Sequence, residues 1–234
     1  MNLGKLTLTG GLRHELISGE VLDYGKVDTS RTGANLKTKE NSYGVFIPGI
    51  GFNYQIEPKL IAFGGVHKGF SPAAVASDVE PESSFNYELG LKYKNKRLGI
   101  QLVSFLNDYQ NMLGSNQNAI GGGGTLEQYN AGEVTVKGVE FSMSKTLLFH
   151  HKEMALPISL GYTYTDARFN SSFDSKNELW GNVVNDDILP FIAKHQLFLD
   201  LSYLYKKWTL NLNTRLRSEM LTKASSNIAN EETN

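Results

Sequence analysis

Apolar and polar residues alternate one by one along many short segments of this chain. In residues 85–93 the odd positions are Phe, Tyr, Leu, Leu and Tyr, and the even positions are Asn, Glu, Gly and Lys. An extended strand places successive side chains on opposite faces, so one face would be apolar and the other wet. The same alternation recurs in residues 6–13, 50–56, 158–165 and 208–213. A helical period fits none of these segments, and the pattern therefore indicates β-strands.

The alternation predicts nine strands joined by connections of two kinds. The strands cover residues 4–16, 44–56, 59–69, 84–94, 97–109, 133–146, 155–168, 193–205 and 208–219. The short connections are Glu57-Pro58 with Lys59, Asn95-Lys96, Leu147 to Met154, and Lys206-Lys207. The long, polar connections are residues 17–43, 70–83, 110–132 and 169–192. Short and long connections alternate, which is typical of an antiparallel transmembrane β-barrel with short periplasmic turns and long outer loops.

Aromatic and charged residues fit the two sides of such a wall. Aromatic rings near the strand ends are expected to form girdles at the membrane interfaces. They are Tyr43, Phe70, Phe85, Tyr93, Tyr109, Phe169, Tyr203, Tyr205 and Trp208. Charged residues within the strands are expected on the wet inner face, because a Lys or Arg facing lipid at the midplane costs about 2 to 4 kcal/mol. They are Arg13, Glu88, Lys92, Glu140, Asp200, Arg215 and Arg217.

Composition excludes several other classes of protein. Hydrophobic residues make up 40% of the 234 residues, but no run approaches the roughly 20 apolar residues of a spanning helix. The net charge of −1 argues against a nucleic-acid partner, which usually requires a basic face. The chain has no cysteine, and this removes disulfides and thiolate metal sites. A soluble β-sandwich would have a polar outward face and loops of mixed length at both ends. The separation of short and long connections argues against that fold.

Candidate chemistry is sparse, and we predict no catalytic, cofactor-binding or metal-binding residues. His150 and His151 are adjacent, so an extended chain points them to opposite faces, and His67 and His195 lack an obvious partner in sequence. The glycines at 121–124 lack the Lys-Ser/Thr of a phosphate-binding loop. No Gly-x-Ser-x-Gly motif occurs, and no Ser-His pair suggests a membrane phospholipase. Six cations in the loops could attract an anionic chelate, but surface cations in polar loops usually only keep a protein soluble. They are Lys26, Arg31, Lys37, Lys39, Arg168 and Lys176. We assign none of them to a site, and the substrate-binding residues stay unknown.

A collinear set of segments resembles the barrel of TonB-dependent outer-membrane receptors. The segments are KLTLTGGLR at 5–13, GFSP at 69–72, VEPESSFNYELGLKY at 79–93, FLNDYQNM at 105–112, GVE at 138–140, YTYTDA at 162–167, GNV at 181–183, LPFIAKHQ at 189–196 and WTLNLNTRL at 208–216. Each motif alone is weak, but their shared order spans most of the chain. The GNV to KH block and the last strand are most similar to receptors of the ferric-citrate type.

The resemblance implies an all-β fold and a role in energised uptake at the cell outer membrane of a Gram-negative bacterium. Residues 1–234 would then be a partial barrel domain, about nine strands of a 22-stranded barrel, without the plug and the last strands. The implied partners are a ferric chelate such as ferric citrate or a siderophore, the TonB complex acting through the plug, and membrane lipid. The alternatives are a passive porin-type barrel and a fragment without function.

Overall fold

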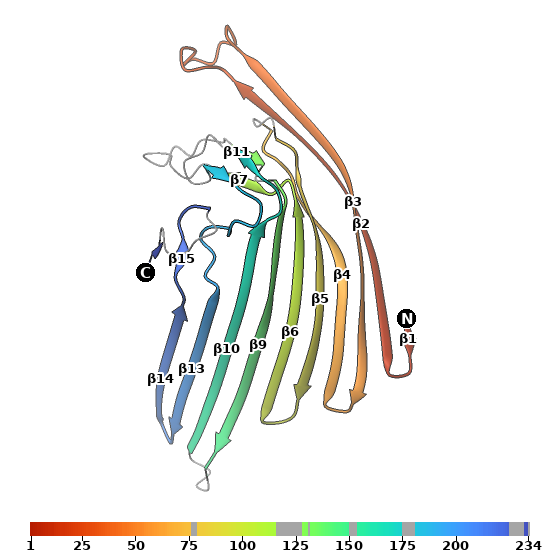
Figure 1. Cartoon of the computed structure of the whole chain (residues 1–234), viewed down its shortest axis with the longest axis vertical. Coiled ribbons are helices and arrows are strands. Elements are labelled where there is room, and N and C mark those ends of the chain that lie inside the picture. The colour runs from red at the N-terminus through yellow and green to blue at the C-terminus, as the bar shows by residue number, and fades with distance from the viewer. Residues whose placement is uncertain are drawn as a thin grey trace.

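One antiparallel sheet contains all the long strands in the described part of the chain. The computed structural model describes residues 1–75, 79–115, 128–130, 132–149, 154–174, 181–224 and 232–233. The strands of this sheet follow one another in chain order, and each pairs with the next one (Figure 1). The order is β1 (Asn2–Leu3), β2 (Leu6–Asp23), β3 (Lys37–Glu57), β4 (Leu60–Ser71), β5 (Glu82–Lys94), β6 (Leu98–Gln110), β9 (Val134–Leu148), β10 (Met154–Phe169), β13 (His195–Tyr205) and β14 (Trp208–Arg217).

Three short strand pairs among the described residues lie outside the main sheet. These pairs are β7 (Leu113–Ser115) with β8 (Gln128–Asn130), β11 (Phe173–Asp174) with β12 (Asn182–Val183), and β15 (Met220–Leu221) with β16 (Glu232–Thr233). All three belong to the end of the sheet where the long connections lie, here called the loop end (Figure 1). The short connections lie at the opposite end, here called the turn end.

The nine predicted strands are confirmed, and their largest error lies at the first long connection. Residues 17–43 were expected to form a loop, but β2 and β3 continue through most of this stretch, as far as the pair Asp23 and Lys37. Here polar residues occupy both faces, so alternation gives no signal although the backbone ladder persists. The connection shrinks to residues 24–36, and the hairpin rises above its neighbours (Figure 1).

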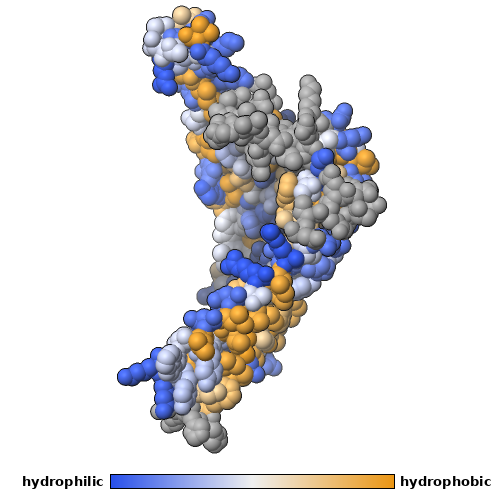
Figure 2. All heavy atoms as spheres, turned by 90° about the vertical axis from the view of Figure 1, so that its left-hand side faces the viewer, coloured by the Kyte–Doolittle hydropathy of each residue, from blue (hydrophilic) through white to orange (hydrophobic). Residues whose placement is uncertain are grey.

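The pairing register gathers the apolar side chains on one face of the sheet. Tyr87 pairs with Val66 on one side and with Leu106 on the other, and all three therefore point the same way. This face is open: Leu89 is 59% exposed and Leu210 is 64% exposed. Apolar side chains gather over the strands, between more hydrophilic regions (Figure 2). An extended, exposed apolar face on a sheet requires an apolar environment, and we call it the lipid face.

The opposite face carries the seven strand charges that the sequence predicts for it. The register places all seven strand charges opposite the lipid face: Arg13, Glu88, Lys92, Glu140, Asp200, Arg215 and Arg217. We call this side the polar face. Among the described residues, no helix is long and apolar enough to cross a membrane.

Aromatic rings pack over glycines on the polar face. The Phe63 ring lies over Gly90, and the Phe105 ring lies over Gly138 on the strand next to its own. A side chain at either glycine would meet the ring and the backbone of a neighbouring strand, at Leu102 O for Gly90 and at Tyr164 O for Gly138. These two glycines therefore let large rings lie flat against the wall.

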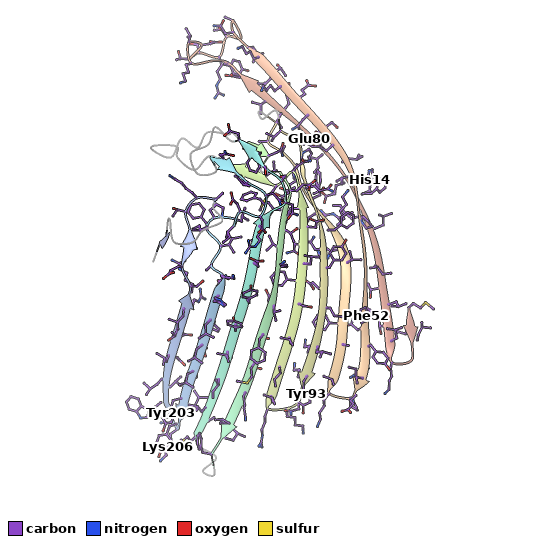
Figure 3. All side chains as sticks on the ribbon, viewed as in Figure 1. His14, Phe52, Glu80, Tyr93, Tyr203 and Lys206 are labelled. Carbon is purple, nitrogen blue, oxygen red and sulfur yellow. The ribbon has the colours of Figure 1, made fainter. Side chains whose placement is uncertain are left out.

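The predicted aromatic girdle is confirmed at the turn end and is wrong in part at the loop end. Tyr93, Tyr203, Tyr205 and Trp208 lie on the lipid face beside the short turns. Tyr93 and Tyr203 are labelled in Figure 3. Phe85 also lies on the lipid face, towards the loop end.

Three of the predicted girdle residues lie elsewhere. Tyr109 and Phe169 belong to the polar face, and Phe169 is completely buried. Tyr43 shares the polar-face parity of Val45 and meets the Phe70 ring edge to face, with ring centroids 6.3 Å apart. An aromatic residue at a strand end therefore does not by itself indicate a membrane interface.

Replacing Gly138 with alanine is expected to destabilise the folded barrel by about 1 to 3 kcal/mol, because the new methyl group overlaps the Tyr164 carbonyl and the Phe105 ring. Urea unfolding of the full gene product in detergent micelles measures this loss. Gly11→Ala is the matched control, since it changes a polar-face strand glycine with nothing within 4 Å of the added atom. Equal stability of the two variants would contradict the packing described above.

An arginine at Leu89 is expected to destabilise the membrane-inserted protein by about 2 to 4 kcal/mol, because this position faces lipid. Gln101→Arg is the control, since Gln101 lies on the polar face of the adjacent strand beside Lys92. Unfolding titrations in lipid vesicles measure both. If the Gln101 variant is the less stable of the two, the assignment of the faces is wrong.

Candidate functional site

Residues 181–192 fold back along the loop end of β10 and form a small core there. The Leu189 amide donates to Ala167 O at 2.9 Å, and the Asp186 amide donates to Phe169 O at 2.8 Å. This pairing carries Val183 and Leu189 into an apolar cluster with Val134, Ala167 and Phe169. Val183 and Leu189 anchor the outer loop to the wall. The cluster thus gives a structural role to two of the receptor-like segments, residues 181–183 and 189–196.

A second set of contacts joins two outer loops through the Glu80-Pro81-Glu82 segment. The Glu82 carboxylate accepts a hydrogen bond from the Leu113 amide at 2.8 Å, and the Glu80 carboxylate accepts one from the Asn111 side chain at 2.8 Å. The Asn130 side chain donates to the carbonyl oxygens of Glu80 and Asn111 and accepts from the Glu80 amide. The two loops are therefore held together at the loop end, where Glu80 lies (Figure 3).

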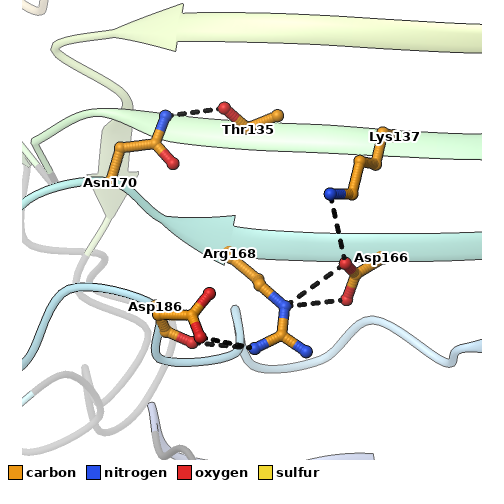
Figure 4. Close-up of polar contacts among 6 residues, drawn as sticks. All are labelled: Thr135, Lys137, Asp166, Arg168, Asn170 and Asp186. Carbon is orange, nitrogen blue, oxygen red and sulfur yellow. Dashed lines mark hydrogen bonds and ion pairs between the residues drawn. The ribbon is translucent and has the colours of Figure 1, made fainter.

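A chain of charges lies at the loop end of the lipid face (Figure 4). Asp166 accepts two hydrogen bonds from Arg168 Nε, at 3.0 and 3.2 Å, and lies 3.8 Å from Lys137 Nζ. Arg168 Nη1 also donates to Asp186 O at 3.0 Å and lies 3.3 Å from the Asp186 carboxylate. Arg168, one of the loop cations weighed in the sequence, is thus held between two carboxylates and is a structural residue of the rim.

The polar face contains a groove with two arginines. It has a volume of about 680 Å³ and runs between β10, β13 and β14. Gly161 and Thr163 lie on one side of it, and Arg215 and Arg217 lie on the other. The Arg215 guanidinium lies over the Phe198 ring, 5.6 Å from its centroid, which fixes its direction. In the described part of the chain, no salt bridge joins either arginine to a carboxylate.

This groove is the best candidate for a solute-binding or partner-binding surface. Arginine presents planar donors that suit carboxylate and phosphate oxygens, and two of them beside the Phe198 ring favour an anionic, partly apolar ligand. The sequence placed Arg215 and Arg217 on the wet face. It did not place them beside Phe198 and Gly161, because this requires the register between strands.

The remaining candidates are dispersed. His195 has no obvious partner in sequence, and the fold supplies one: its Nδ1 lies 2.9 Å from the Tyr162 hydroxyl across the β10–β13 pair. His67 lies on the polar face of β4 opposite Gly49. The pair His150-His151, the glycines at 121–124 and Lys176 lie outside the described residues. Within the described residues, no three His, Asp or Glu side chains are grouped to hold a metal ion.

The tip of the β2–β3 hairpin is organised by one carboxylate. Asp28 accepts hydrogen bonds from the Thr32 amide at 2.8 Å, the Thr32 hydroxyl at 3.0 Å and the Gly33 amide at 2.7 Å. The Arg31 guanidinium lies 5.7 Å from the centroid of the Tyr24 ring. The Thr32 amide, with the other donors, outweighs burial and lowers the pKa of Asp28 below its usual 3.8. Arg31 is therefore part of an ordered tip, where it stacks on an aromatic ring.

The fold and its two faces define part of the wall of a transmembrane β-barrel. The family model described as "TonB dependent receptor-like, beta-barrel" matches residues 1–233. The chain belongs to the TonB-dependent receptor family, whose barrels lie in the outer membrane of Gram-negative bacteria.

Solved structures of other receptors share this fold. The unliganded ferric citrate transporter FecA is 23% identical with a TM-score of 0.67, and the match covers 94% of this chain and 31% of FecA. The siderophore receptor PiuA from Acinetobacter baumannii is 18% identical with a TM-score of 0.69, covering 93% and 31%. The copper transporter OprC is 17% identical with a TM-score of 0.62, covering 94% and 32%. The chain thus spans about a third of the length of these structures.

Acid is expected to loosen the tip of the β2–β3 hairpin. Because the pKa of Asp28 is lower in the folded loop than in the unfolded chain, its contribution is complete above about pH 3.8 and is lost as the pH falls through the lowered folded value. Asp28→Asn removes the charge at every pH and should speed hydrogen exchange at the Thr32 and Gly33 amides at neutral pH. Asp23→Asn, which changes a single hydrogen bond to Gly25, is the control. Unchanged exchange in the Asp28 variant would show that the carboxylate does not hold the tip.

Proposed function

We propose that this chain forms part of the wall of a receptor that takes up an anionic ferric chelate, such as ferric citrate or a ferric siderophore, by energised transport. The chain acts in transport and not as an enzyme. In the TonB-dependent mechanism, outer loops capture the solute, a plug blocks the lumen, and coupling to the TonB complex rearranges the plug. This wall supplies a rigid inner surface and part of the loop platform.

The observation that carries the proposal is the groove on the polar face with Arg215 and Arg217. A polar face turned away from lipid is the side that a solute or a plug contacts in a barrel of this family. Two arginines without a salt bridge among the described residues leave donors for an anionic ligand. Receptors and transporters described for ferric citrate, for a siderophore and for copper share this fold, so the fold alone does not select the solute.

The test is uptake of radioactive iron by cells that lack their own ferric-chelate receptors and express the full gene product. Supplied with ferric citrate or with a hydroxamate or catecholate siderophore, these cells should accumulate iron only when TonB is present. Uptake that continues without TonB would support the passive porin-type barrel and overturn the proposal.

The arginines provide the second arm of this experiment. Arg215→Gln with Arg217→Gln should weaken chelate binding about tenfold or more, because a hydrogen bond to a charged group contributes about 1.5 to 3 kcal/mol. Lys92→Gln is the matched control, since Lys92 lies on the same face but away from this groove. Equal loss in the control would show a general effect of inner-face charge.

A further inference from the structure

The lipid face contains a groove that crosses five strands and ends at a lysine. Its volume is about 690 Å³. Its floor is one row of the sheet, in which Ile50 pairs with Val66, Val66 with Tyr87, Tyr87 with Leu106, and Leu106 with Lys137. Four strand spacings of about 4.8 Å make this row roughly 19 Å long. The first four residues are apolar or aromatic, and the last one is cationic.

The next row towards the turn end contributes Phe52, Leu89 and Ser104 to the side of the groove. It reads Phe52, Gly64, Leu89, Ser104 and Val139, so two of its five positions have very small side chains. The Phe52 ring and the Leu89 side chain close over Gly64, within 3.3 Å of where a Cβ would lie. Ser104 donates its hydroxyl to Leu89 O at 3.2 Å and offers no free donor to the groove.

The groove runs from the middle of the apolar region to its outer boundary. On β3, apolar residues continue beyond Ile50 towards the loop end as far as Phe46, which is 59% exposed. On β9, the apolar residues of the lipid face end at Val139, and Lys137 follows. Strands in such barrels tilt by about 35 to 45°, so a row perpendicular to them is also oblique to the membrane. The two ends of the groove therefore lie at different depths.

The charge at the outer end is available to a ligand. Lys137 Nζ lies 3.8 Å from Asp166, whose carboxylate already accepts two shorter hydrogen bonds from Arg168, and the Lys137 side chain is 59% exposed. Asp108 and Thr135 face the same side at this level, and the Thr135 hydroxyl lies 3.5 Å from Asp108. Acidic and basic residues therefore alternate at this end of the groove, from Asp108 through Lys137 and Asp166 to Arg168. Among them, Lys137 lines the groove.

We propose that this groove holds one acyl chain of a phosphorylated lipid of the outer leaflet, with the lipid phosphate bound by Lys137. The groove is continuous with the lipid-facing surface, which identifies the occupant as bilayer lipid. Its cationic end at the membrane boundary matches a phosphate, and its apolar, oblique floor matches a chain that descends from that phosphate. The site is independent of the transported solute, because it lies on the opposite side of the wall from Arg215 and Arg217.

The test uses the full gene product purified in detergent and native mass spectrometry. The probes are dioleoyl phosphatidylglycerol and digalactosyl diacylglycerol with the same chains, added together in equal amounts. The protein should retain the charged lipid in preference to the neutral one. Lys137→Gln should reduce retention of phosphatidylglycerol about fivefold and leave the neutral lipid unchanged. Lys145→Gln is the control, because Lys145 lies on the same face of β9 at the turn end and outside the groove.

Filling the groove provides the second variant. Val66→Trp should abolish specific retention of both lipids, and Leu106→Trp replaces it if that protein does not show the heat-modifiable migration of a folded barrel. Equal retention in the filled and native proteins would overturn the proposal. So would an equal loss in the Lys137 and Lys145 variants. If the filled variant loses dimers and keeps its bound lipid, a second copy of the barrel covers the groove, and the proposal is also overturned.

Discussion

Backbone hydrogen bonding in lipid is the constraint from which this structure follows. Lipid offers no partner to a peptide group, and each unpaired group costs several kcal/mol, so every membrane-spanning strand must pair along its length with its neighbours. The β9–β10 ladder shows the result: it runs without interruption from the pair Leu148 and Ala155 to the pair Val134 and Phe169. Neighbours in the chain become neighbours in the sheet, and the side chains are left to divide between two faces.

That division separates the tasks of the wall. The middle of the lipid face has to be apolar, and its charged residues, such as Lys137, Asp166 and Lys145, lie towards its two ends. Large rings on the polar face, such as Phe63 and Phe105, lie flat only because Gly90 and Gly138 leave room for them. A wall packed in this way keeps a fixed shape, which is what two arginines in a groove need if they are to hold a ligand in one orientation.

Much of the wall could be predicted from the sequence, because a period of two shows on which face each residue of a strand lies. This period placed Glu88, Lys92, Arg215 and Arg217 correctly. It would also have placed Phe169 correctly, since Phe169 has the parity of the polar face, but the aromatic residue was assigned by its position at a strand end. Contacts between strands were beyond prediction, because the Arg215–Phe198 and Tyr162–His195 neighbours depend on register, which the period alone does not set.

The same constraint explains where prediction of the strands failed and why the failure is informative. On β9, the apolar residues of the lipid face end at Val139 towards the loop end, where Lys137 and Thr135 follow. Beyond this boundary water satisfies the backbone, and a strand no longer needs an apolar face. β2 and β3 continue there with polar residues on both faces. Their alternation is lost at this boundary, whereas their ladder continues to the pair Asp23 and Lys37, so the loss of alternation does not mark the end of the strands.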